Sequence, residues 1–247
     1  MEHPAVVAVS IDRGDGRNSL DDAMIGELDA GLTKAEADSG CRLFVVTGGA
    51  GVFSTGMDLA AAGSSPGTAA QVEPGGAYFD LLLRLVTTPR TVVTLVDGQA
   101  AGGGVGLVAA SDVVLATGTS TFALPEALWG LLPCVVLPFL RRRIGGHRAR
   151  SMMVTTQPVD AGTAQSWGLV DVVGDDLPAA LRPIVFRAGK LAAETIGAAK
   201  RYAARLDPID ADTRTAAVSE LAELLAAPAV QERLAAFAGS GKFPWES

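Results

Sequence analysis

Hydrophobic positions along the chain follow two alternating patterns, short β-type runs and longer stretches with helical spacing. The β-type runs consist mainly of Val, Ile, Leu and Ala, and they lie at residues 5–11, 43–47, 91–96 and 113–116. Between the first two runs an apolar residue recurs at every fourth position, at Leu20, Met24, Leu28 and Leu32. This spacing predicts an amphipathic helix, and a second helix is predicted at residues 78–86. Strands that alternate with helices indicate an α/β fold with crossover connections.

The first helix carries recognisable start signals. We expect Asn18 or Ser19 to cap it, and Asp21 and Asp22 to lie in its first turn, where the helix dipole favours negative charge.

The second half of the chain is predicted to be mostly helical, apart from a short β-type piece at residues 170–173. Ala-rich stretches separated by Gly, Pro or Asp lie at residues 179–193, 195–206, 214–226 and 229–238. This region must bury its apolar faces either against the first half of its own chain or against other subunits. It has more apolar surface than one small core can cover, so we expect it to pack on neighbouring subunits. The chain is thus predicted to consist of a core at residues 1–173 and a helical C-terminal oligomerisation region at residues 174–247.

Composition excludes several classes of protein. Of 247 residues, 49% are hydrophobic and 19% are charged, which is typical of a globular chain and not of a disordered one. A net charge of −7 argues against a generally basic nucleic-acid-binding protein. Two Cys and two His residues leave no disulfide framework and no Cys/His-rich metal site. Neither a signal peptide nor a membrane-spanning apolar run is found, so we expect a cytoplasmic protein.

Two Gly-rich segments each follow a predicted strand. They are TGGAGVFSTGMDL at residues 47–59 and VDGQAAGGGVGLVAASD at residues 96–112, and a further Gly-rich stretch at residues 63–76 predicts a loop beside the site. By itself a Gly-rich turn is commonly no more than a tight turn. Two such turns side by side, each leading into a helix, can direct two backbone N–H groups at one oxygen and so form an oxyanion hole.

The chain resembles the enoyl-CoA hydratase/isomerase (crotonase) superfamily in five motifs, which occur in order along most of its length. These motifs are IDRGDGRNSL at residues 11–20, FSTGMDL at 53–59, GQAAGGGVGL at 98–107, TFALPEALWGLLP at 121–133 and QPVDAGTAQSWGLVDVV at 157–173. The resemblance implies a spiral of ββα turns that carries a thioester site, followed by a helical trimerisation region. It also implies that the N–H groups of Met57 and Gly103 hold the enolate oxygen of a thioester, and that Glu126 is catalytic.

Two positions depart from the hydratases of this superfamily. Hydratases carry two catalytic Glu residues; Gly106 stands in place of the first, and Glu126 matches the second. One carboxylate suits removal or transfer of a single proton beside a carbonyl group. Asp15 stands where many hydratases have a Lys near the CoA phosphates, which favours a carrier-bound substrate, although Arg17 lies close by.

Residues 78–85, 122–145 and 241–246 resemble more closely the dehydratases of polyketide β-branching. That resemblance implies dehydration of a 3-hydroxy-3-methylglutaryl thioester on an acyl carrier protein to the 3-methylglutaconyl form. Glu126 would remove the C2 proton and return it to the leaving C3 hydroxyl. No cofactor is expected beyond the phosphopantetheine arm of the carrier. The expected partners are the carrier protein, a decarboxylase of the same superfamily that acts next, and further copies of the chain in a homotrimer or a dimer of trimers.

Arginine clusters supply the remaining site predictions. Arg141, Arg142 and Arg143 lie in the densest basic stretch and are candidates for docking an acidic carrier protein; the alternative is a solvated helix face or pairing between subunits. Arg84 is a candidate partner for the distal carboxylate of a glutaryl chain. Asp80, one turn earlier, is a second candidate at the substrate site or else the salt-bridge partner of Arg84.

Three other functions stay open at this stage. An isomerase that moves a double bond between C3 and C2 also needs only one Glu, and a decarboxylase could use the oxyanion hole alone. A non-catalytic scaffold with the same fold is the third. Retention of Glu126 together with both Gly-rich turns argues against the scaffold, because a scaffold needs none of these features together.

Overall fold

The computed structural model describes residues 3–14, 16–49, 51–59, 61 and 75–243. Asp15, most of the Gly-rich stretch at residues 63–76 and the end of the segment at residues 241–246 lie outside the described residues. No helix within the described ranges is long and apolar enough to cross a lipid bilayer.

Two sheets form the centre of the molecule. The first has five parallel strands in the order β1-β2-β4-β6-β9, namely β1 (Val6–Ile11), β2 (Leu43–Gly48), β4 (Thr91–Val96), β6 (Val113–Ala116) and β9 (Val172–Val173). The second has the order β3-β5-β7-β8, namely β3 (Val52–Ser54), β5 (Gln99–Ala101), β7 (Thr121–Ala123) and β8 (Val159–Asp160), and only the β7–β8 pair is antiparallel. The first sheet matches the predicted β-type runs. The second sheet was not predicted, because strands of two or three residues are too short to show a period.

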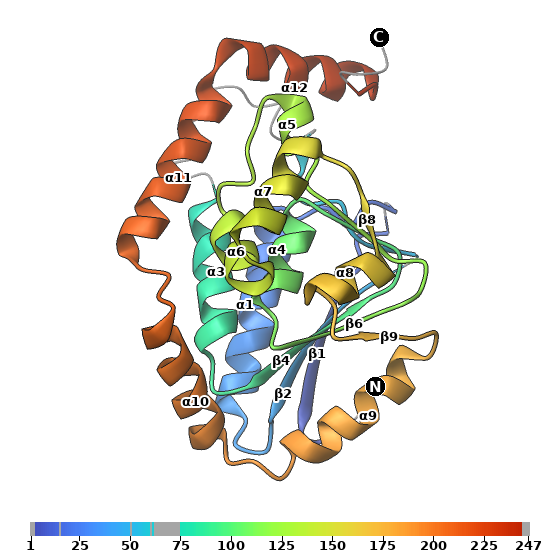
Figure 1. Ribbon diagram of the computed structural model, residues 1–247, viewed down its shortest axis with the longest axis vertical. Coiled ribbons are helices and arrows are strands. Elements are labelled where there is room, and N and C mark those ends of the chain that lie inside the picture. The colour runs from blue at the N-terminus through green and yellow to red at the C-terminus, as the bar shows by residue number, and fades with distance from the viewer. Residues whose placement is uncertain (1–2, 15, 50, 60, 62–74, 244–247) are drawn as a thin grey trace.

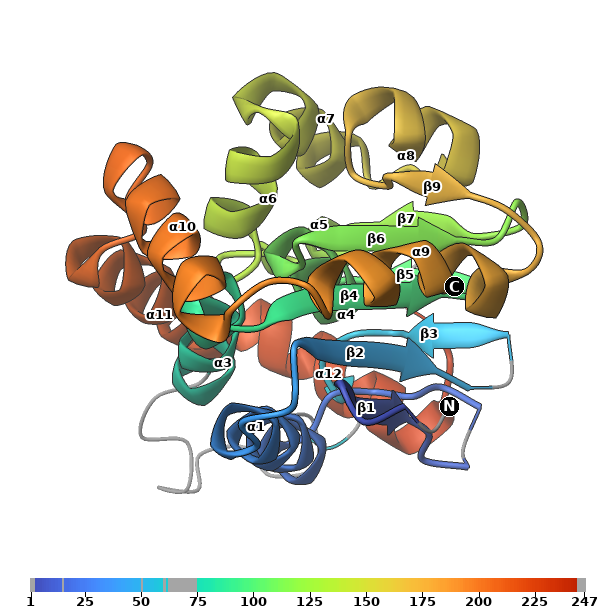
Figure 2. The same ribbon diagram turned by 90° about the horizontal axis from the view of Figure 1, so that it is seen from below.

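The chain winds as a spiral whose central turns each add one strand to each sheet and then a helix. Thus β4 and β5 are followed by α4 (Gly103–Ala110), and β6 and β7 are followed by α5 (Glu126–Trp129). Figure 2 shows these turns stacked on one another, from β1 and β2 through β4 and β5 to β6 and β7. The predicted α/β spiral is therefore confirmed. Because the carboxyl ends of parallel strands lie on one side, the loops that follow them gather there.

The remaining helices surround this spiral. They are α1 (Asp22–Ala37), α3 (Gly76–Thr87), α6 (Leu137–Ile144), α7 (Gly146–Thr155), α8 (Ala161–Trp167), α9 (Leu177–Ala188), α10 (Ala193–Leu206), α11 (Ala211–Ala226) and α12 (Pro228–Ser240). The predicted cap of the first helix was wrong, because Asp21 is the N-cap and accepts a hydrogen bond from the Met24 N–H at 2.8 Å. The Asn18 side chain instead hydrogen-bonds to the carbonyls of Gly49 and Val52. Asp22 lies in the first turn, as expected.

The last two helices pack on their own chain. Leu221 and Leu225 of α11 and Leu234 and Phe237 of α12 are buried in the main core with residues of the spiral. The Phe237 ring meets Trp129 of α5 edge to face, with centroids 5.0 Å apart. Figure 1 shows α10, α11 and α12 following one edge of the molecule and ending above α5. The buried residues of α11 and α12 thus pack on the first half of their own chain, and packing of the C-terminal region on neighbouring subunits stays a prediction.

The helices α9 and α10, which begin the C-terminal region, are less completely covered than α11 and α12. On α9, Leu181 packs on the outer face of the first sheet against Leu115 and its neighbours. Phe186 of α9 and Tyr202 and Leu206 of α10 are 65%, 57% and 69% exposed. The described C-terminal helices therefore share both hydrophobic cores with the spiral, while α9 and α10 keep apolar side chains at the surface.

Replacement of Phe237 tests the packing of α12 on its own subunit. Phe237→Ala is expected to lower the free energy of unfolding by about 3–5 kcal/mol, because it removes a buried ring and leaves a cavity. Val154→Ala, at an exposed apolar position on α7, is the control and should change it by less than about 0.5 kcal/mol. Urea unfolding at a fixed protein concentration measures both; equal midpoints for the two variants would contradict the placement of α12.

Candidate active site

Backbone and side-chain hydrogen bonds join the first motif, at residues 11–20, to the first Gly-rich turn, at residues 47–59. The Leu20 N–H donates to the Gly56 carbonyl at 2.7 Å, and the Thr55 N–H donates to the Arg17 carbonyl at 3.0 Å. Asn18 is buried with a φ of 50°, and its Nδ2 donates to the carbonyls of Gly49 and Val52 at 3.1 and 2.7 Å. Asn18 therefore connects the first motif to the first Gly-rich turn. This role was not predicted, because an Asn before a helix usually indicates an N-cap.

Arg13 extends the same connection. Its guanidinium donates to the Ser19 hydroxyl at 2.6 Å and to Asp58 at 3.1 Å, and it lies 3.0 Å from Asp21. Burial by itself would raise the pKa of Asp58, but the Ala61 N–H and Arg13 together lower it. Arg13 thus holds the start of α1 against the end of the first Gly-rich turn.

The two Gly-rich turns touch at Gly56 and Gly103. Gly56 has a φ of 86°, and a Cβ there would lie 2.9 Å from the Ala101 oxygen and 2.9 Å from the Gly103 nitrogen. Real side chains do not approach backbone atoms so closely, and the left-handed conformation adds a further cost for any residue with a Cβ. Only glycine allows the turns to meet at this distance.

Met57 and Gly103 carry the N–H groups that we expected to form the oxyanion hole, and both residues line one cavity. Gly103 is the first residue of α4, so its N–H has no partner within the helix. Met57 follows Gly56 directly and pairs with Leu20 in an isolated parallel bridge. The fold brings the two predicted donors together, and their catalytic role remains a prediction.

The cavity has a volume of about 420 Å³ and a mostly apolar lining. Its walls come from segments far apart in the sequence, including the start of α1, both Gly-rich turns, α3, the segment from α5 to α6, and α11. Leu221 and Leu225 of α11 contribute to it directly. The C-terminal region therefore helps to form the site, in addition to any role in assembly.

Glu126 is the first residue of α5, and its carboxyl group lies beside the second Gly-rich turn. A Cβ at Gly102 would come within 3.1 Å of its Oε1. Its Oε2 is buried and has no hydrogen-bond partner among the described residues. Burial raises the pKa of Glu126 from 4.5 to about 7, against the lowering effect of its own backbone N–H. Such a carboxyl is present in both forms near neutral pH, so it can accept a proton and return it.

Three other carboxylates, Asp21, Asp22 and Asp58, also line this cavity. Asp21 and Asp58 are bound to Arg13, and Asp22 is exposed at the surface. Of the carboxylates that line the cavity within the described ranges, Glu126 is thus the one that is both buried and outside an ion pair.

The structure does not bring Asp80 and Arg84 to the cavity. Arg84 forms ion pairs with Asp29 and with Glu36, both on α1, the latter at 2.8 Å. Asp80 accepts from Arg214 of α11 at 2.7 Å. The expected salt bridge between Asp80 and Arg84 is absent from the described contacts because each residue has found a partner on another helix. Both residues join α3 to its neighbours, and neither lines the cavity that holds Glu126.

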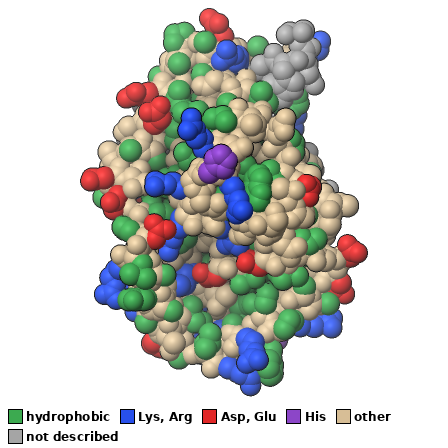
Figure 3. Space-filling view, in the orientation of Figure 1, with side chains coloured by type: hydrophobic (Ala, Val, Ile, Leu, Met, Phe, Trp, Pro, Cys, Tyr) green, Lys and Arg blue, Asp and Glu red, His purple; other side chains and the backbone are tan. Residues whose placement is uncertain are grey.

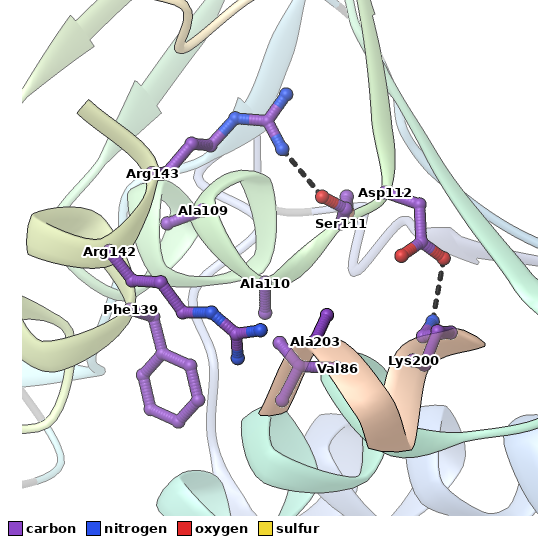
Figure 4. Close-up of a pocket in the computed structure, with 10 residues that line it drawn as sticks. All are labelled: Val86, Ala109, Ala110, Ser111, Asp112, Phe139, Arg142, Arg143, Lys200 and Ala203. Atoms are coloured by element: carbon purple, nitrogen blue, oxygen red, sulfur yellow. Dashed lines mark hydrogen bonds and ion pairs between the residues drawn. The ribbon is translucent and has the colours of Figure 1, made fainter. Parts of the chain in front are cut away.

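A second cavity, of about 260 Å³, lies between α4, α6 and α10 and contains much of the predicted arginine cluster. Arg143 donates to the Leu169 carbonyl at 2.9 Å and pairs with Asp171 at 2.7 Å. Lys200 pairs with Asp112 at 2.6 Å, as Figure 4 shows. Burial lowers the pKa of both cations, partly offset by these carboxylates. Both cations form ion pairs within the chain, so Arg143 has a structural role and is a poor candidate for docking a carrier protein.

The two preceding arginines are more accessible. The Arg142 guanidinium is directed into the second cavity, toward Ala110 and Ala203, and lies 3.8 Å from Asp207. Arg141 is exposed. Figure 3 shows Lys and Arg side chains gathered over the middle of one face, where α6 and α7 lie. Arg141 is therefore the member of the cluster that is best placed to meet a partner.

No group of three or more His, Cys, Asp or Glu side chains that could hold a metal ion occurs in the described part of the chain.

The raised pKa of Glu126 predicts an effect on stability. Between its ordinary value of 4.5 and about 7, the folded protein keeps a proton that the unfolded chain has lost. Stability should therefore fall as pH rises through this window. Glu126→Gln removes the effect, so the variant should be more stable than wild type at pH 8, by at most about 3 kcal/mol, with the difference closing near pH 5. Urea unfolding at both pH values measures this, with the exposed Glu223→Gln as control; a pH-independent difference would contradict the assignment.

Comparison with known proteins places this site in a family. Residues 2–247 match the family model for enoyl-CoA hydratase/isomerase. The chain is 30% identical over 98% of its length, and 93% of the relative's, to the bacillaene synthase dehydratase PksH of Bacillus subtilis (strain 168). It is also 30% identical to the 1,2-epoxyphenylacetyl-CoA isomerase of Escherichia coli (strain K12), covering 69% of this chain and 67% of the relative.

Solved structures of related proteins have the same fold as this chain. A crystal structure of pksH from Bacillus subtilis, described as a polyketide biosynthesis enoyl-CoA hydratase, superimposes with a TM-score of 0.92 at 28% identity, covering 99% of this chain and 97% of that one. The predictions of a crotonase-type fold and of a lyase-class enzyme are confirmed, and the chain belongs to the enoyl-CoA hydratase/isomerase family.

Proposed function

We propose that the protein dehydrates a 3-hydroxy-3-methylglutaryl group, or a related β-hydroxy-β-alkyl group, held as a thioester on an acyl carrier protein. The product is the 3-methylglutaconyl thioester. The observation that supports this most directly is the carboxyl group of Glu126 in an apolar cavity next to both Gly-rich turns, with a buried Oε2 that has no hydrogen-bond partner among the residues the structure describes. The likeness to the bacillaene synthase dehydratase over almost the whole chain adds to it.

The proposed reaction needs one acid–base group. The Glu126 carboxylate takes the C2 proton, and the electron pair of the C–H bond moves to the thioester oxygen, where the Met57 and Gly103 N–H groups stabilise the negative charge. The carbonyl then re-forms, a double bond forms between C2 and C3, and the C3 hydroxyl departs. Protonated Glu126 donates its proton to that hydroxyl, which leaves as water, so the carboxylate is regenerated. The residues of this chain suffice for the step, and we propose that it uses no cofactor.

One acid–base group is enough for this elimination, because the proton taken from C2 is the one delivered to the leaving hydroxyl. The second carboxylate of the superfamily's hydratases is therefore not needed, and Gly106 stands in its place. Hydration, as the reverse reaction, would use the same group, so the site sets the mechanism and the substrate sets the direction. A double-bond isomerase is the alternative that this arrangement also allows, and the relative that isomerises an epoxyphenylacetyl thioester belongs to the same family. The product formed from a hydroxyacyl carrier protein distinguishes the two reactions.

The proposal extends to partners and assembly. We propose an acyl carrier protein as the substrate donor and a decarboxylase as the enzyme that consumes the glutaconyl product, whose distal carboxylate becomes a leaving group once the double bond is in place. We also propose a cytoplasmic homotrimer or dimer of trimers. Phe186, Tyr202 and Leu206 on α9 and α10 support the assembly, because they are large apolar side chains at the surface and burial between subunits would remove them from water.

Loss of the base should abolish turnover. Glu126→Gln is expected to lower kcat by at least about 10²- to 10⁴-fold, because the amide fits the cavity but cannot accept the C2 proton. Mass spectrometry of the loaded carrier protein follows the loss of water. Glu223→Gln, on the outer face of α11, should keep the wild-type rate. A Glu126→Gln variant with half of the wild-type kcat would refute the role of Glu126.

Carrier recognition should be partly electrostatic. Thioesters on the carrier protein should react with a higher kcat/KM than the same acyl group on CoA, and the advantage should shrink as salt rises to a few tenths molar. Arg141→Glu should raise KM for the carrier substrate about fivefold, an effect of roughly 1 kcal/mol, and leave a short pantetheine thioester unaffected. Arg187→Glu on α9 is the matched control. Equal kcat/KM for CoA and carrier substrates, or equal damage by both reversals, would contradict carrier docking at α6.

A further inference from the structure

Gly106 lies on α4 at a position where a Cβ would require neighbouring side chains to shift. A Cβ there would lie 2.7 Å from the Tyr78 hydroxyl, 3.1 Å from Val136 and 3.3 Å from Leu82. The last two contacts involve the ends of aliphatic side chains, which can shift slightly. The first is shorter than any contact that a Cβ makes in real structures, so the hydroxyl of Tyr78 is what closes this space.

Tyr78 is held firmly in that position. Its side chain projects from α3, is 7% exposed, and lines the same cavity as Glu126. The hydroxyl donates a hydrogen bond to the carbonyl oxygen of Gly103, the first residue of α4. Burial raises the pKa of Tyr78 well above its ordinary value, the Leu107 backbone opposes this, and the charge of Glu126 adds to it. The phenol therefore stays neutral and acts as a hydrogen-bond donor.

The contact adds a side-chain hydrogen bond to a glycine-rich segment that backbone hydrogen bonds and close packing also hold. Gly102, Gly103, Gly104 and Gly106 stand close together at the start of α4, and glycines lose the most backbone freedom on folding. One side-chain hydrogen bond to this turn limits its movement relative to α3. Donors that stabilise a developing negative charge work best when they are already in position, because no energy is then spent on reorganisation during the reaction.

We propose that Tyr78 is the positioning residue of this site: its hydroxyl helps to hold the first turn of α4 in place and occupies the space that a Cβ at position 106 would need. Among the residues that the structure describes, Glu126 is then the buried carboxyl group beside this turn. The role rests on the proposed function for its chemistry, since enolate formation is the step that the turn would assist. Tyr78 touches the backbone beside the proposed oxyanion donor, and it acts on the reaction through that backbone.

Tyr78→Phe removes the hydroxyl and keeps the ring. We expect kcat to fall about tenfold, a part of the 10²- to 10³-fold cost of losing an oxyanion donor, with KM unchanged within about twofold because the cavity lining remains. A residue that only supported folding would lower the active fraction, so kcat is expressed per folded active enzyme, measured by active-site titration; a purely structural role would leave that value unchanged. Tyr202→Phe, which alters the other tyrosine of the chain on exposed α10, should match wild type.

A double-mutant cycle tests the contact itself. Gly106→Ala should lower Tm and activity in the wild-type background, because its Cβ meets the hydroxyl. In the Tyr78→Phe background the same change should cost clearly less, since the closest atom is gone. Gly26→Ala on α1, where a Cβ would meet nothing within 4 Å, is the control for replacing a helical glycine. Equal costs of Gly106→Ala in both backgrounds would overturn the proposal.

The readouts separate this proposal from the function proposed above. Exchange of the C2 proton of a simple acyl-pantetheine thioester with deuterated water, followed by NMR, reports enolate formation without dehydration. If Tyr78→Phe slows exchange about tenfold while wild type fails to dehydrate the hydroxymethylglutaryl carrier, the dehydratase assignment falls and the role of Tyr78 stands. If wild type dehydrates that carrier and Tyr78→Phe equals it in both assays, the role of Tyr78 is refuted and the function stands.

Discussion

The close contact of two backbones at Gly56 and Gly103 is the constraint on which this site depends. Both glycines end a strand–turn unit of the spiral, and a Cβ on Gly56 would sit 2.9 Å from the Gly103 nitrogen. The two turns follow the carboxyl ends of neighbouring parallel strands, so they lie on the same side of the sheets. Because Gly56 and Gly103 have no side chains, the two backbones can come into contact. The network around Arg13 and Asn18 then holds the first turn, and Tyr78 holds the second.

Burial of a carboxyl group links stability to chemistry. Glu126 gains its raised pKa from apolar walls that include Leu221 and Leu225, which lie almost a hundred residues further along the chain. Keeping a carboxyl without a partner in such surroundings costs free energy. Packing of α11 and α12 on the spiral offsets this cost, so the helices that stabilise the subunit also create the environment that a base near neutral pH requires.

The same long-range packing explains which site predictions failed. Asp80, Arg84 and Arg143 have the charge and the sequence position of functional residues, yet each forms ion pairs with an element that sequence alone does not place beside it. Asn18 looked like a helix cap and instead joins two turns. In each case a polar side chain had several possible partners, and only the packing of the helices and loops selected one of them.

The hydrophobic period by itself determined an α/β fold, the strands of the first sheet and most helices, because period is a local signal. The sequence motifs also indicated the family, and the spiral of ββα turns and the place of Glu126 beside the Gly-rich turns were implied by that family resemblance. Tertiary structure alone decided the second sheet, the placement of α11 over the cavity and the space closed by Tyr78 at Gly106. Those features depend on contacts between residues distant in the chain, and neither the period nor the composition of a local segment records such contacts.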